Sequence, residues 1–140
     1  MAEITVNIRI SNIEDRIKRH LSIIGKRIVD ANGESLFDKI TLSSAEVGIL
    51  DDFISDAIDD IISNTRDFFS SRSSGSLVFK FSVDTDVNNQ KLQPLFEDFC
   101  FQHSIGAWME TVQPQLANGY FDAATQQMHN IISLIYNKTI

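Results

Sequence analysis

Cysteine, proline and glycine are all scarce in this chain of 140 residues, which has one, two and six of them. The lone thiol, Cys100, cannot form a disulfide within the chain, so nothing implies an oxidising compartment. The apolar runs are far shorter than the roughly 18 residues that suggest a membrane span. We therefore expect one intracellular domain over residues 1–140, with the cysteine in its core and no membrane contact.

Motifs for catalysis or cofactor binding are also missing. His20 and His129 lack a carboxylate at a spacing that would orient an imidazole, and no nucleophile motif or glycine-rich phosphate loop occurs. Gly25-Lys26 does not follow the glycine pattern of a phosphate loop. The sequence therefore predicts neither an enzyme nor a cofactor site.

Two weak metal-binding patterns remain. The segment 84–88 matches the first ligand positions of a calcium loop, but Asn89 replaces the required glycine and Leu95 the required glutamate. Glu97, Cys100 and His103 could share a helix face, yet no second ligand cluster accompanies them. A turn before a helix, and a buried thiol beside a helix histidine, are the favoured interpretations, so no metal is expected.

Period-two alternation of apolar residues predicts two strands, over residues 4–10 and 77–83. Their apolar positions are Ile4, Val6, Ile8 and Ile10 in the first, and Leu77, Phe79, Phe81 and Val83 in the second. A lone two-stranded ribbon is marginal in water, so it requires a helix beneath it or strands from another copy. The sequence leaves both arrangements open.

Helical spacing of apolar residues predicts four helices. The first starts at a Ser11–Glu14 capping box and ends at Asn32-Gly33, and the second runs from a Ser43–Glu46 box to Phe69. The third covers 90–112, is apolar nearly all round and should be central, and Pro114 separates it from the last. The fold class is mainly α, a bundle of about four helices with a small two-stranded β element. Its parts are a strand arm (1–10), a helical hairpin (11–69), a loop and strand (70–89, with a serine-rich loop over 70–76) and C-terminal helices (90–140).

Charge is distributed unevenly, although the net value is −7. Residues 1–29 hold six basic and three acidic side chains, whereas residues 30–67 hold two basic and ten acidic ones. Such asymmetry either orients complementary contacts between copies or reflects two solvated faces of a monomer. The carboxylates of the second helix lie opposite its apolar stripe, unlike those of a metal site inside a bundle.

The order of elements resembles that of head–tail connector (adaptor or neck) proteins of tailed bacteriophages. The resemblance rests on the acidic helix region 40–69, ITLSSAEVGILDDFISDAIDDIISNTRDFF, and on the region 95–138. The second region contains Ile105-Gly106-Ala107-Trp108, then Pro114-Gln115-Leu116-Ala117, and a terminal helix ending at Lys138.

This resemblance implies a non-enzymatic ring component of the virion, present in the host cytoplasm before assembly. Its partners would be further copies of itself, the portal protein, and tail or further neck proteins, with DNA passing without sequence-specific contact. The expected interface residues come from the strands and from the outer faces of the first two helices. They are Ile4, Val6, Ile8, Arg16, Lys18, Arg19, Lys26, Arg27, Asp52, Asp56, Asp59, Asp60, Phe79 and Phe81. The alternative is a small cytoplasmic binding or regulatory helical module, whose basic helix contacts nucleic acid or an acidic partner.

Overall fold

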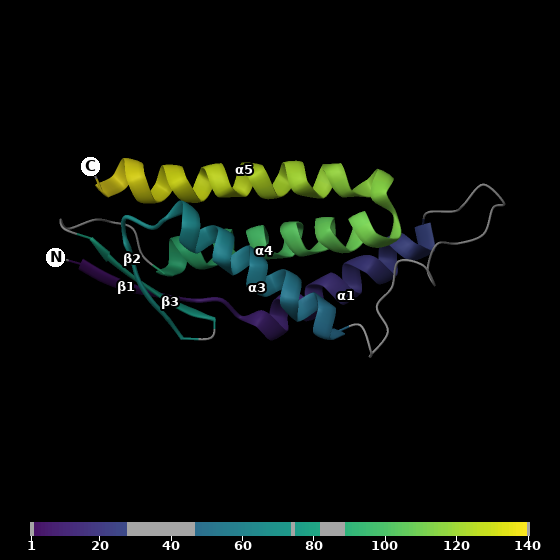
Figure 1. Ribbon diagram of the computed structural model, residues 1–140, viewed down its shortest axis with the longest axis horizontal. Coiled ribbons are helices and arrows are strands. Elements are labelled where there is room, and N and C mark those ends of the chain that lie inside the picture. The colour runs from purple at the N-terminus through teal and green to yellow at the C-terminus, as the bar shows by residue number, and fades with distance from the viewer. Residues whose placement is uncertain (1, 28–46, 74, 82–88, 140) are drawn as a thin grey trace.

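The computed structural model describes residues 2–27, 47–73, 75–81 and 89–139. In chain order its elements are β1 (Ala2–Asn7), α1 (Ile10–Arg27), α3 (Val47–Asn64), β2 (Phe69–Ser73), β3 (Ser76–Phe81), α4 (Asn89–Val112) and α5 (Pro114–Thr139). The expected class, mainly α with a small β element, is confirmed, and Figure 1 shows the sheet at one end of the helices. None of the described helices is long and apolar enough to cross a membrane.

Helix α4 is the central element, as its all-round apolar sequence predicts. It packs against α5, α3, α1 and β1, and in Figure 1 α5 runs alongside it for most of its length. Phe96, Ile105 and Met109 of α4 are completely buried, and Trp108 is nearly so. Gly106 allows the close approach of α5, because a Cβ at this position would lie 2.8 Å from the ring of Phe121. One core therefore joins the four helices that the structure describes.

The sheet has three antiparallel strands in the order β1-β3-β2, so the strands pair within the chain. Ile4 of β1 lies opposite Phe79 of β3, and Val6 lies opposite Leu77. We expected two strands, whereas the sheet has three. The third strand lies in a segment that we expected to be a helix end followed by a serine-rich loop.

A threonine turn explains this difference. The hydroxyl of Thr65 donates a hydrogen bond to the carbonyl of Ile61 (2.7 Å), and α3 ends at Asn64 rather than at Phe69. The amides of Phe68 and Phe69 both donate to the Thr65 carbonyl (3.1 Å), which turns the chain toward the sheet. Phe69 then packs edge-on against Phe79 (6.0 Å between ring centroids), and the following polar residues pair with β3 through their backbone.

The start of α1 also differs from the prediction. The Ile13 amide donates to the Arg9 carbonyl (3.1 Å), so Arg9 occupies the capping position and the helix begins at Ile10. The Ser11–Glu14 capping box is therefore wrong, and β1 ends at Asn7 instead of extending to residue 10. The second capping box and the glycine end of the first helix lie outside the described residues.

Candidate functional site

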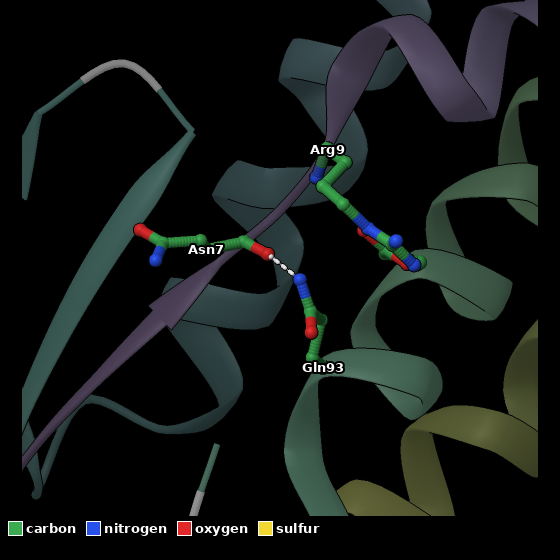
Figure 2. Close-up of polar contacts among 4 residues, drawn as sticks. Asn7, Arg9 and Gln93 are labelled. Atoms are coloured by element: carbon green, nitrogen blue, oxygen red, sulfur yellow. Dashed lines mark hydrogen bonds and ion pairs between the residues drawn. The ribbon is translucent and has the colours of Figure 1, made fainter. Parts of the chain in front are cut away.

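An arginine–glutamate pair fixes the start of α1 on α4. Arg9 donates three hydrogen bonds to the Glu97 carboxylate: its backbone N–H and Nε reach Oε2 at 2.8 and 2.9 Å, and Nη2 reaches Oε1 at 2.7 Å. One turn earlier on α4, the Gln93 amide donates to the Asn7 carbonyl (2.6 Å), the dashed contact in Figure 2. The junction between β1 and α1 is thus attached to α4 at two points.

Electrostatics make this pair a structural contact. Burial acts to raise the pKa of Glu97, but the hydrogen bonds and charge of Arg9 outweigh it and hold that pKa below its ordinary value. The same contact raises the pKa of Arg9. Both groups are therefore ionised near neutral pH, and Glu97 is poorly suited to donate a proton.

A groove follows the side of α1 that borders α4. Arg9, which caps α1, shares this side with four residues of the helix, and we call the five the α1 stripe: Arg9, Asn12, Arg16, Arg19 and Ile23. The groove contains one hollow of about 410 Å³, which is lined by the first four of them and by Ile13, Asp15 and Glu97. A second hollow, of about 450 Å³, reaches Ile23. The stripe is therefore a cationic edge that ends in an exposed isoleucine.

Arg16 is held in place at the middle of this groove. Its guanidinium pairs with Asp98 of α4 (2.9 Å) and lies over the Phe101 ring, 3.8 Å from the centroid. Next to it, Nε2 of His20 lies 2.8 Å from the Tyr120 hydroxyl. Burial, and to a lesser extent the charge of Arg16, lower the pKa of His20, which favours its neutral form at neutral pH. Arg19 has no ion-pair partner in the part of the chain that the structure describes.

The outer face of α3 carries the opposite charge. Five exposed residues line its centre, and we call them the α3 stripe: Ile49, Asp52, Asp56, Asp59 and Ser63. Asp59 pairs with Arg72 of β2 (2.6 Å), whereas Asp52 and Asp56 have no ion-pair partner within the described ranges. Ile49 is 45% exposed and Ile23 is 51% exposed, and they are the two exposed large hydrophobic side chains of the described residues. Each stripe therefore combines charge of one sign with one exposed isoleucine.

A third hollow, of about 340 Å³, lies between α3, α4 and α5. His103 stacks on Phe99 inside it (5.6 Å, 26° between ring planes), and its Nδ1 lies 4.0 Å from Asp60 Oδ2. Cys100 is buried, which raises the pKa of its thiol to about 12.

Across the described segments, no group of three or more His, Cys, Asp or Glu residues could hold a metal ion. The segment 84–88, which resembled a calcium loop, lies outside them.

The structure separates the interface residues expected from the sequence into two groups. Val6 of β1, Phe79 of β3 and Ile8, which directly follows β1, are at most 5% exposed because their side chains lie in the core. Ile4 is half-buried. A second copy could not reach the three buried side chains without opening the core. The side chains of Lys26, Arg27 and Phe81 lie outside the description.

The remaining expected residues are exposed on two helices. Arg16, Lys18 and Arg19 lie on the surface of α1, and the acidic group lies on the surface of α3. The acidic residues are Asp52, Asp56, Asp59 and Asp60. Sequence reasoning missed Arg9 and the two exposed isoleucines, although an apolar residue on an otherwise charged helix face is a readable signal for Ile23 and Ile49.

No family model, curated protein or solved structure matches this chain. The resemblance to phage connector proteins therefore stays a prediction from the sequence.

Proposed function

We propose that this chain is a structural virion protein, a head–tail connector or neck protein that joins the portal to the tail. As a ring component it would form part of the DNA channel and contact the passing DNA without sequence specificity. It would be located in the virion, and in the host cytoplasm before assembly. No catalytic step belongs to this role.

The observation that carries the proposal is the segregation of opposite charges onto two exposed helices. Each subunit of a ring presents two different lateral surfaces that complement each other, because the contact is head-to-tail and closes by rotation. The cationic α1 and the acidic α3 provide two such surfaces. Both helices pack on α4, so the core sets their separation.

Reconstitution with a portal tests the proposal. The purified chain is mixed with the portal protein encoded near its gene, and the complexes are imaged by electron microscopy. We expect an additional ring of density beneath the portal, and mass spectrometry of purified particles should detect the chain in multiple copies per particle. Absence of the chain from particles encoded by its neighbouring genes would refute the proposed role.

A second candidate, a small binding or regulatory module, is favoured by one observation. Three arginines line the α1 groove beside Asp15 and Glu97, and arginines are common in surfaces that contact phosphates or acidic proteins. Two of them, Arg9 and Arg16, already pair with carboxylates of α4, which reduces the net positive charge of the groove. This function predicts salt-sensitive retention on DNA that is lost when Lys18, Arg19, Lys26 and Arg27 are replaced by alanine.

A further inference from the structure

The two stripes have the same spacing along their helices. Members of the α1 stripe lie at positions 9, 12, 16, 19 and 23, and members of the α3 stripe lie at 49, 52, 56, 59 and 63. Alternating steps of three and four residues keep side chains on one side of a helix, which is the pattern of a helix–helix seam. Both helices therefore present a narrow row that could meet a second helix along its length.

The chemistry of the two rows is complementary when the helices run antiparallel. Ile23 at the C-terminal end of the α1 stripe then lies opposite Ile49 at the N-terminal end of the α3 stripe. Continuing along the seam, Arg19 lies opposite Asp52, and Arg16 lies opposite Asp56. A parallel arrangement would place Ile23 opposite Ser63 and Ile49 opposite Arg9, so that each isoleucine would face a polar side chain. The apolar pair therefore selects the antiparallel direction.

Within one chain the same two helices meet through other residues. The carboxyl group of Glu14 in α1 lies near that of Asp51 in α3, and both residues lie away from the stripes on their helices. Burial, followed by the contact with Asp51, raises the pKa of Glu14, as expected where two carboxyl groups approach each other. This approach of two carboxyl groups inside the chain is between like charges, while the complementary rows remain exposed.

We propose that the α1 stripe of one copy of this chain binds the α3 stripe of a second copy, antiparallel, with Ile23 against Ile49. The α1 groove offers space for the incoming helix, since its two hollows extend from Arg9 to Ile23. Arg19, Asp52 and Asp56 have no ion pair to break among the described residues, whereas Arg16 would bridge Asp98 of its own chain and Asp56 of the second copy. The contact rests on the proposed function and deepens it, because it names the two lateral surfaces of the ring subunit.

Disulfide trapping tests this contact directly. A chain carrying Ile23→Cys is mixed with a chain carrying Ile49→Cys under mild oxidation, and linked dimers are counted on a non-reducing gel. We expect many more linked dimers in the mixture than in either chain alone, because each chain alone lacks one of the two thiols at the seam. The native Cys100 is buried and its thiol pKa is about 12, so it should not compete.

Two results would overturn the inference. The first is a mixture that forms no more dimer than the separate chains, with both introduced thiols shown to react with a small maleimide. The second is efficient linkage of Ile23→Cys to Ser63→Cys, the pair that a parallel seam would bring together.

Charge reversal gives an independent test. Arg19→Glu and Asp52→Arg should each weaken self-association on the order of tenfold, measured by analytical ultracentrifugation, because each places like charges opposite one another. A mixture of the two variants should regain association, because the glutamate introduced on α1 then faces the arginine introduced on α3. The control Lys18→Glu, on another side of α1, should leave self-association unchanged.

The inference would be overturned if Arg19→Glu, Asp52→Arg and Lys18→Glu weakened self-association equally. It would also be overturned if the mixture of Arg19→Glu and Asp52→Arg associated no better than either variant alone. These measurements use the chain by itself, without a portal or particles. A negative result in these measurements therefore overturns only the contact between the stripes, whereas absence of the chain from particles refutes the proposed function.

Discussion

Replacing Glu97 with glutamine tests how strongly its buried carboxylate holds the junction between β1 and α1. The substitution keeps the shape of the side chain and removes its charge. Three donors of Arg9 converge on this carboxylate at 2.7 to 2.9 Å, and the Glu97 side chain is only 11% exposed. Glutamine has one acceptor oxygen for these donors and turns an NH₂ group toward the others, so at least one hydrogen bond is lost.

The expected magnitude follows from the hydrogen bonds. A hydrogen bond to a charged group contributes about 1.5–3 kcal/mol. Loss of one such bond, with weakening of the rest, should lower the free energy of unfolding of Glu97→Gln by about 2 kcal/mol at neutral pH. Urea denaturation followed by the fluorescence of Trp108, the single tryptophan and 3% exposed, measures this change. The matched control is Glu110→Gln, exposed near the end of the same helix, which should change stability by less than about 0.5 kcal/mol.

The pH dependence has a defined sign. The pKa of Glu97 in the folded chain lies below its unfolded value of about 4.3, so its contribution is present above that pH and is lost as the pH falls through the folded pKa. The difference between the wild type and Glu97→Gln should therefore shrink in acid. The reasoning is refuted if Glu97→Gln is as stable as Glu110→Gln at neutral pH, or if the difference stays constant down to about pH 3.

Three further substitutions should change stability in the same urea assay. Gly75→Ala should lower the free energy of unfolding by more than about 1 kcal/mol, because the new Cβ would lie 2.5 Å from the Ile8 carbonyl oxygen. Phe79→Ala should lower it by about 3–5 kcal/mol, because the ring is completely buried. Glu14→Gln should raise the free energy of unfolding at neutral pH. Burial and the nearby Asp51 raise the pKa of Glu14 in the folded chain, so ionised Glu14 destabilises the fold above its unfolded pKa. This destabilisation disappears in acid, where Glu14 is protonated in both states.

Matched variants check the reasons given for these effects. Gly119→Ala in α5 meets no atom within 4 Å and should be neutral or stabilising, so an equal loss at Gly75 and Gly119 would contradict the steric explanation. Phe79→Leu should lose clearly less stability than Phe79→Ala. A Glu14→Gln variant that is less stable than the wild type at neutral pH would show that the carboxyl pair is not a repulsive contact.

Much of the fold could be predicted from the sequence because its apolar residues repeat with a clear period. The helices and the strands β1 and β3 all carry such a pattern. Strand β2 could not be predicted, because most of its side chains are exposed and polar and it is held by backbone pairing with β3. The end of α3 was missed for a related reason: helical spacing continues to Phe68, and the turn at Thr65 depends on contacts with the sheet.

Of the candidate site, only the exposed charged residues could be predicted from the sequence. Helical spacing correctly placed Arg16, Arg19 and the carboxylates of α3 on exposed faces. The contact between Arg9 and Glu97 joins residues 88 positions apart, and no local pattern reports a partner at that distance. The burial of Val6, Ile8 and Phe79 was likewise undetermined, because an alternating strand shows which side chains share a face but not what covers that face.

The intrachain contacts and the proposed seam between copies depend on one another through α4. Glu97 holds Arg9, and Asp98, the next residue of α4, holds Arg16, so two members of the α1 stripe are fixed before a second copy arrives. A side chain already ordered in the monomer loses less conformational entropy on association, which strengthens binding without adding contacts. Removal of the Asp98 carboxylate should therefore weaken self-association even though Asp98 lies outside both stripes. Asp98→Asn, compared with Asp122→Asn on the exposed surface of α5, distinguishes this effect from a general change in charge.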